Sequence, residues 1–426
     1  MATSSIPHLL ILEPDSRGHA REWVGHLVAA ANRAGPDALR LSLVVPPALA
    51  EEVENASPPG PRQTVRAITL TPGEVASCMH RRLWISGMAR WWIMRRYMVR
   101  AEATHGLFLA LDHLSLPLAL GLGAGHRPLS GILFRPSVHY RHINAHQPSW
   151  RERLRDLRKA ILYRLMLRNP AVGTVLSLDP YFADFAAAHR YPQASKVVAT
   201  PDPVCPAPAP TAAERRLADR VPEERTTFVL FGELTARKGV LVLLDALKLI
   251  PPEVARRIAI VVAGSLDPPI RDTVRRTVAH IHRLRPDLWL NLEDRRLATG
   301  EIVALLERSQ VVLVPYQRFV GSSGIVLWAA QAKRPVLCQD YGLVGRLTRD
   351  FGLGTTLDTT SAESLAQAMA AAARDSGAIT FDTRGMDRLC GSRRPERFAQ
   401  IVIEGALCGH HDTRLAPAPS GREAVP

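Results

Sequence analysis

The chain has 426 residues, which exceeds what one hydrophobic core organises and suffices for two domains. Its five cysteines are scattered and form no CxxC pair, which excludes a disulfide scaffold and zinc-ligand spacing and fits a reducing cytosol. A formal net charge of +14 indicates an anionic partner, such as nucleic acid, an anionic membrane or a phosphorylated substrate.

The first part of the chain alternates short apolar runs with segments of helical spacing. Residues 8–14 and 39–46 read as buried strands, with a helix over residues 18–33 between them. Further strands are expected near Ile68, Leu109, Leu133, Leu176 and Val198. We predict no secretory signal, and the apolar residues 107–123 fall short of the roughly 20 needed to span a bilayer.

The composition changes over residues 206–225, which are rich in proline, alanine and charge as a linker is. The alternation of strand and helix then restarts. The prediction is an α/β protein with two Rossmann-like doubly wound domains, residues 1–205 and 226–395, facing a cleft. Residues 396–426 are expected to form a C-terminal helix and a disordered tail.

The segment FGELTARKG, residues 231–239, carries the first chemical signal. A strand ends at Gly232, and Arg237 and Lys238 stand at the entrance of a leucine-rich helix. Two cations beside the outward-pointing N–H groups of a helix N-terminus suit a diphosphate. A basic helix start on a solvated face is the alternative interpretation.

The segment VGSSG, residues 320–324, is the second signal. Gly321 and Gly324 allow close approach of a ligand to the backbone, and Ser322 and Ser323 stand at a predicted helix N-terminus. The alternative is an ordinary serine N-cap. Two such loops, each between a strand and a helix of one domain, favour a shared phosphate site.

These loops, with VVAGSLD between them, resemble the nucleotide-sugar-binding domain of the group 1 (family 4) glycosyltransferases of GT-B fold. The likeness covers residues 226–344 and implies a retaining, metal-independent transfer without a cofactor. It implies that Arg237 and Lys238 bind the donor diphosphate as catalytic cations, and that amides at Ser322, Ser323 and Gly324 bind the same group. The full predicted donor site is Gly18, Gly232, Arg237, Lys238, Gly264, Glu293, Gln317, Gly321, Ser322, Ser323 and Gly324.

The sequence departs from the family pattern at four positions. Glu233 stands where an arginine is usual, and Lys333 where a glycine is usual. Val320 and Trp328 occupy the positions of two family glutamates. Tyr316, Gln317 or Glu293 are candidates to replace those carboxylates. The alternative function is a non-catalytic glycosyltransferase-like protein that binds a saccharide or a partner.

The N-terminal domain is expected to hold a saccharide or lipid-linked acceptor, as in cell-envelope or exopolysaccharide synthesis. Gly18 follows the first strand, where the family has a loop that faces the donor phosphate. His139 is the best match to the family histidine near the reacting sugar, with His142 the alternative. Asp112 is either a polar group at the cleft or a helix cap.

Two segments concentrate the basic charge. Residues 79–100 contain no acid, and residues 150–168 place leucines near helical spacing among arginines. Cationic, aromatic helices suit an anionic membrane surface; a solvated arginine face over a buried apolar stripe is the alternative. No nucleic-acid-binding signature is present, and a nucleic-acid partner is not expected. The predicted membrane residues are Arg81, Arg82, Trp91, Trp92, Arg95 and Arg96.

Overall fold

The computed structural model describes residues 6–16, 19–57, 63–142 and 149–408. By internal contacts the chain divides into two compact units. The first comprises Met1–Pro136, Leu154–Asp202 and Pro395–Pro426, and the second comprises Ser137–Arg153 and Pro203–Arg394. Each unit is described by itself.

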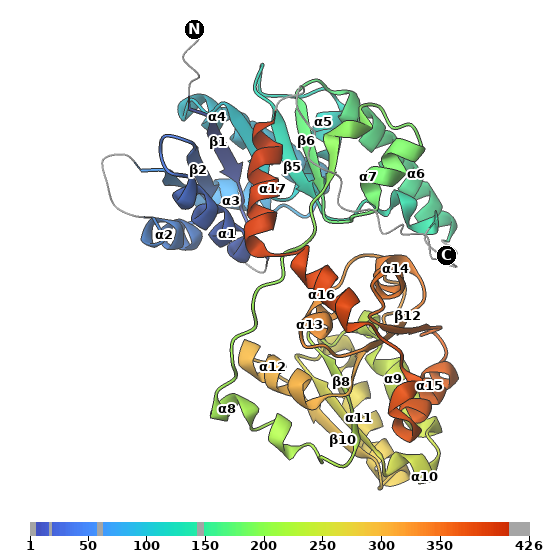
Figure 1. The fold of residues 1–426 in the computed structure, drawn as a ribbon. Coiled ribbons are helices and arrows are strands. Elements are labelled where there is room, and N and C mark those ends of the chain that lie inside the picture. Colours follow the sequence, from blue (N-terminus) through green and yellow to red (C-terminus); the bar gives the residue numbers. More distant parts are fainter. Residues whose placement is uncertain (1–5, 17–18, 58–62, 143–148, 409–426) are drawn as a thin grey trace. The chain divides into compact units, whose positions relative to one another are not determined.

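The first unit is built on a seven-stranded parallel sheet of order β3-β2-β1-β4-β5-β6-β7 (Figure 1). Its strands are β1 (His8–Leu12), β2 (Arg40–Val45), β3 (Val65–Thr69), β4 (His105–Phe108), β5 (Leu129–Leu133), β6 (Val172–Ser177) and β7 (Val197–Ala199). Its helices are α1 (His19–Ala34), α2 (Pro47–Asn55), α3 (Pro72–Cys78), α4 (Leu83–Arg100), η1 (Leu111–Leu114), α5 (Ser115–Ala119), α6 (Trp150–Arg168, which belongs to this unit from Leu154 on), α7 (Phe182–Ala188), η3 (Ala194–Lys196) and α17 (Pro395–Leu407).

The second unit has a six-stranded parallel sheet of order β10-β9-β8-β11-β12-β13. Its strands are β8 (Thr226–Phe231), β9 (Ile258–Ala263), β10 (Trp289–Glu293), β11 (Val311–Val314), β12 (Val336–Gln339) and β13 (Gly354–Leu357). Its helices are η2 (Ser137–His142), α8 (Ala212–Arg215), η4 (Ala218–Arg220), η5 (Ala236–Lys238), α9 (Val240–Leu249), α10 (Pro252–Ala255), α11 (Pro268–Leu284), α12 (Thr299–Arg308), α13 (Gly324–Gln331), α14 (Gly342–Phe351), α15 (Ala362–Arg374), η6 (Ser376–Ala378) and α16 (Thr383–Gly391).

The strands form because their residues are apolar on both faces, as a sheet covered on both sides by helices requires. Every residue of β1, β6 and β9 is buried. The predicted fold class, two Rossmann-like doubly wound domains, is confirmed. The segment expected as a linker carries α8, whose Arg215 pairs with Glu307 of α12 at 2.8 Å.

The C-terminal helix α17 returns to the first unit, where the red helix in Figure 1 lies with the blue and green elements. Phe398 of α17 packs on Trp23 of α1 with ring centroids 5.2 Å apart. Trp23 in turn stacks on Phe134 at 5.1 Å, just beyond β5. The helix thus completes the apolar cover of the N-terminal sheet.

Each sheet reverses its strand order once, between β1 and β4 in the first unit and between β8 and β11 in the second. At such a point the loops leaving the two neighbouring strands diverge to opposite faces, and the crevice at the carboxyl ends is the usual ligand site. Among the described residues, none of the helices combines the length and apolarity that crossing a bilayer requires.

Candidate functional site

The two loops singled out in the sequence leave the two strands at the reversal point of the second sheet. Residues 232–239 follow β8, residues 315–323 follow β11, and β8 pairs directly with β11. The structure therefore brings both predicted phosphate loops to one crevice within one unit.

Gly239 holds these loops together. Its φ is +78°, and a Cβ there would lie 1.9 Å from the carbonyl oxygen of Pro315. The amide of Gln317 also donates to the carbonyl oxygen of Arg237 at 2.8 Å. Only glycine allows this left-handed turn and this approach together, so the residue fixes the spacing between the two loops.

A chain of hydrogen bonds then runs from the first loop to the helix behind the second. Lys238 Nζ donates to the Tyr316 hydroxyl at 2.5 Å. The Tyr316 hydroxyl bonds Ser323 Oγ at 2.7 Å, and Ser323 Oγ accepts from the amide of Ile325 at 3.3 Å. Ser323 is thus the N-cap of α13, and the ammonium is anchored to the helix N-terminus.

Burial changes the pKa of Lys238. The pKa of Lys238 is lowered to about 8, mainly by desolvation and also by the neighbouring Arg237, while Glu233 partly opposes the shift. Burial also raises the pKa of Tyr316 well above its usual range, so its hydroxyl stays protonated. Arg237 is exposed, with its guanidinium 4.7 Å from the ring centroid of Phe319. An anion bound here would meet one partly buried ammonium and one exposed guanidinium.

The start of α13 is open toward solvent. A Cβ on Gly324 would meet no atom within 4 Å, so the packing of the fold does not require glycine there. Ser322 and Gly324 are exposed, whereas Gly321 is buried. An exposed glycine that the fold does not demand, at a helix N-terminus, fits a backbone that a phosphate approaches closely.

The other predicted donor residues form a second group at the strand ends. The amide of Gly232 donates to Ala263, and the amide of Gly264 donates to the carbonyl oxygen of Glu293 at 2.9 Å. The Glu293 carboxylate is held by Arg295 Nε at 2.7 Å. These residues share the carboxyl edge of the sheet.

The side chain of Gln317 turns inward. Its amide nitrogen donates to the carbonyl oxygens of Pro315 and Thr359. These hydrogen bonds stabilise the loop after β11. Val320 and Trp328, at the positions of the two family glutamates, are both half-buried, and Glu233 is exposed. The described part of this crevice therefore has cationic side chains at one end, and it lacks carboxylates at the two positions where the resembling family has glutamates.

The predicted site residues of the first part of the chain have different outcomes. Gly18 lies outside the described residues, as does the side chain of His142. His139 is buried, with its ring 4.7 Å from that of Tyr140. Asp112 accepts from the amide of Phe134 at 2.8 Å and thereby ties η1 to the end of β5, which is a structural use of its carboxylate.

Glu13 is a candidate that the sequence analysis missed. It follows β1 directly at the reversal point of the first sheet and is only 4% exposed. Burial raises its pKa to about 7, while the nearby Arg90, itself buried, opposes the shift. Glu13 begins the segment EPDSRGH, residues 13–19, and nothing in the sequence shows that its carboxyl is buried.

The predicted membrane residues lie on α4 or, for Arg81 and Arg82, just before it. Some of them are exposed and others make contacts within the fold. Arg81, Arg82, Trp92 and Arg95 are exposed. Arg96 pairs with Glu74 and lies 4.5 Å from the Trp92 ring centroid. The buried face of α4 comprises Ser86, Gly87, Arg90, Ile93, Met94, Tyr97 and Met98.

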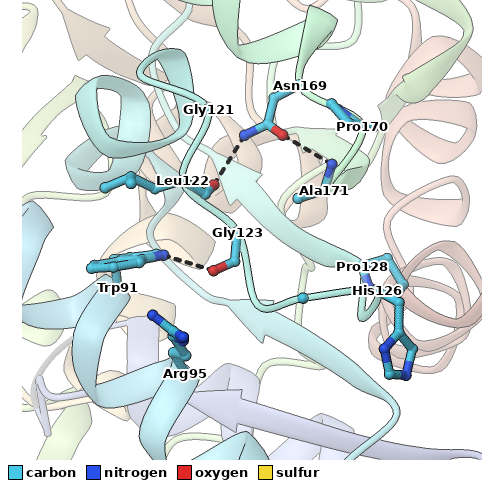
Figure 2. A pocket seen from close by; sticks show the side chains of 11 residues that line it. Trp91, Arg95, Gly121, Leu122, Gly123, His126, Pro128, Asn169, Pro170 and Ala171 are labelled. Atoms are coloured by element: carbon cyan, nitrogen blue, oxygen red, sulfur yellow. Dashed lines mark hydrogen bonds between the residues drawn. The ribbon is translucent and has the colours of Figure 1, made fainter.

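A pocket of about 730 Å³ opens beside α4 at the amino ends of β5 and β6 (Figure 2). Trp91 Nε1 donates to the carbonyl oxygen of Gly123 at 3.1 Å, and Asn169 Nδ2 donates to that of Leu122. Arg95 and His126 are the basic residues among those that line it. This pocket is at the opposite end of the strands from Glu13.

Comparison with known proteins supports the resemblance seen in the sequence. Residues 225–375 match the family model for glycosyl transferases group 1. A comparison with curated protein sequences finds no match.

Three solved structures illustrate the similarity in fold. A glycosyltransferase from Rickettsia africae ESF-5 is 13% identical with a TM-score of 0.64, and the match covers 94% of this chain and 97% of that chain. Anabaena HepE in complex with UDP and glucose is 14% identical at 0.61, covering 93% and 98%. Sucrose-phosphate synthase from Thermosynechococcus elongatus is 16% identical at 0.65, covering 93% and 98%. Residues 225–375 thus resemble the group 1 glycosyl transferases, and the two parallel sheets of this chain have the GT-B fold of these glycosyltransferases.

Proposed function

We propose that the protein transfers a sugar from a nucleotide-diphosphate sugar to a saccharide or lipid-linked acceptor in cell-envelope or exopolysaccharide synthesis. One observation carries this proposal. Hydrogen bonds link Lys238 through Tyr316 to Ser323 at the reversal point of the second sheet. The fold similarity to HepE, whose structures contain UDP, glucose or UDP-glucose, supports a nucleotide-sugar donor.

The chemistry follows from where negative charge develops. As the bond between the anomeric carbon and the β-phosphate oxygen breaks, its electron pair moves to that oxygen. Lys238, Arg237 and the amides at the start of α13 are placed to stabilise the diphosphate that leaves. His139 and the loop at Gly18 are proposed to act beside the reacting sugar. The acceptor hydroxyl bonds the anomeric carbon on the face that the diphosphate leaves, and its proton passes to the departing β-phosphate oxygen.

The test is a transfer assay with a panel of UDP-, GDP- and ADP-sugars and saccharide acceptors, in which released nucleoside diphosphate is measured and the product anomer is read by proton NMR. We expect retained configuration and a rate unchanged by EDTA, because protein cations replace a metal in this proposal. An inverted product would contradict the retaining mechanism, and loss of activity in EDTA would contradict metal independence.

The pH dependence of donor use should report Lys238. Because its pKa in the free protein is about 8, the ammonium loses its proton as the pH rises through 8. The kcat/KM for the donor should therefore be constant on the acid side of this pKa and fall about tenfold per unit well above it. In Lys238→Arg the side chain stays charged throughout the range, so this fall should disappear. The measurement is kcat/KM from pH 6.5 to 9.5, and an identical profile for both proteins would exclude Lys238 as the titrating group.

We also propose a cytoplasmic protein that binds peripherally to an anionic membrane, where a lipid-linked acceptor would be presented. The exposed arginines and Trp92 of α4 support this part of the proposal, because basic and aromatic side chains together suit the headgroup region.

A further inference from the structure

The outer face of α6 (Trp150–Arg168) carries an apolar stripe that no part of the described chain covers. Leu154, Leu157, Ile161 and Leu165 are 61%, 59%, 50% and 40% exposed. At about 100° per residue these four side chains fall within about 80° of the helix circumference. Trp150, which is 69% exposed, lies on the same line.

The inner face of the same helix is occupied by a separate set of residues. Asp156, Tyr163, Met166 and Leu167 are buried and lie on the opposite side of the helix. Tyr163 packs edge-on against Phe182 of α7, with ring centroids 5.9 Å apart. The helix is thus fixed to its unit by one face while a second apolar face points to solvent, so the stripe is not the core-packing side.

Arginines border the stripe on both sides. Arg151 and Arg158 flank it along one edge, and Arg153 and Arg164 along the other, each about 60–80° from Ile161. Arg164 donates to the carbonyl oxygens of His189 and Arg190 and lies 4.2 Å from the Tyr191 ring centroid. These contacts hold its guanidinium beside the stripe.

An apolar stripe with arginines on both sides favours an anionic bilayer over a second copy of the chain as its partner. A second copy paired through the stripe would bring two basic borders against each other, and like charges at short range repel. An anionic bilayer offers hydrocarbon for the stripe and phosphates for both borders, which is how basic amphipathic helices lie at a membrane interface. We propose that the outer face of α6 docks the protein on an anionic lipid bilayer, with the leucine stripe inserted and the arginines among the phosphates.

The inference deepens the proposed membrane partner and is tested without any transfer reaction, so either can fail alone. The measurement is flotation of the full chain with vesicles of phosphatidylcholine alone or mixed with phosphatidylglycerol. Wild type should float with the anionic vesicles only. Leu157→Asp/Ile161→Asp should abolish flotation, whereas Leu249→Asp/Leu284→Asp, at exposed sites of the second unit, should not.

A second variant pair probes the charge. Arg151→Gln/Arg158→Gln should weaken binding roughly 30-fold, from about fivefold for each arginine removed. Arg276→Gln/Arg283→Gln, also exposed, should bind like wild type. Circular dichroism should show all four variants folded, because every changed side chain is exposed. Flotation of the stripe variant at the wild-type level would overturn the proposal, as would a wild-type chain that stays off anionic vesicles and instead forms a dimer that the stripe variant loses.

Discussion

Replacing Lys238 with alanine should lower the rate of sugar transfer by about 10²–10³-fold, the usual cost of removing one positioned group that stabilises developing negative charge. The fold should survive. The ammonium is partly desolvated, as its lowered pKa shows, so its removal relieves a burial cost, and the Tyr316 hydroxyl keeps Ser323 as a partner. The measurement is the initial rate of nucleoside diphosphate release, with thermal unfolding followed in parallel.

Lys238→Arg and Lys248→Ala serve as controls for that variant. Arginine keeps the positive charge but replaces a compact ammonium with a planar guanidinium, so the Lys238→Arg variant should retain part of the activity. Lys248, near the end of α9, pairs with Asp245 at 2.7 Å away from the loops, and its replacement should leave the rate unchanged. A Lys238→Ala protein with near wild-type turnover would remove the diphosphate role of this residue.

Replacing Gly239 with alanine should destabilise the second unit by about 2–4 kcal/mol, from left-handed strain together with a backbone clash. The added Cβ would lie 1.9 Å from the Pro315 carbonyl oxygen, so the loops after β8 and β11 must separate. Because that separation moves Lys238 away from Tyr316, donor binding should weaken as well. Urea unfolding and nucleotide titration measure the two effects.

Substitutions at two other glycines distinguish backbone strain, the clash with Pro315 and the effect on nucleotide binding. Gly35 has nearly the same φ, +82°, with no atom near an added Cβ, so Gly35→Ala should cost only the backbone strain of about 1 kcal/mol. Gly324→Ala, in open space, should keep stability and weaken only nucleotide binding. If Gly239→Ala were as stable as Gly35→Ala, the close approach of the two loops would not be a constraint on the fold.

The strands that could be predicted are those whose apolar runs are long and bounded by glycine or proline. β1, β2, β8 and β9 are buried at nearly every residue, so a continuous hydrophobic run identifies them. β13, GTTL, is short and only half-buried at the edge of its sheet, and nothing in its composition distinguishes it from a loop.

The position of the two loops was predictable because strand end, small residues and helix start all lie close together in the sequence. The bond from Lys238 to Tyr316 was not, because the partners are 78 residues apart and only the pairing of β8 with β11 brings them together. The face of α6 that packs on its unit could likewise not be predicted from the sequence. Its leucines have helical spacing whichever way they face, and the burial of Tyr163 and Met166 decided it.

The departures at Val320 and Trp328 keep the non-catalytic alternative testable. Both side chains are half-buried, Val320 just before α13 and Trp328 within it, and the resemblance implies glutamates at these two positions. A protein that binds a nucleotide-sugar without turning it over would bind the donor in titration and release no nucleoside diphosphate with any acceptor at any pH.

The most direct test is calorimetric titration of the full chain with UDP, GDP and ADP, comparing wild type with Lys238→Ala. The account predicts binding of at least one nucleoside diphosphate and its loss in the variant, because the ammonium and the start of α13 share one phosphate site. Absence of binding by wild type, or equal binding by both proteins, would contradict a diphosphate site built by Lys238 and Ser323.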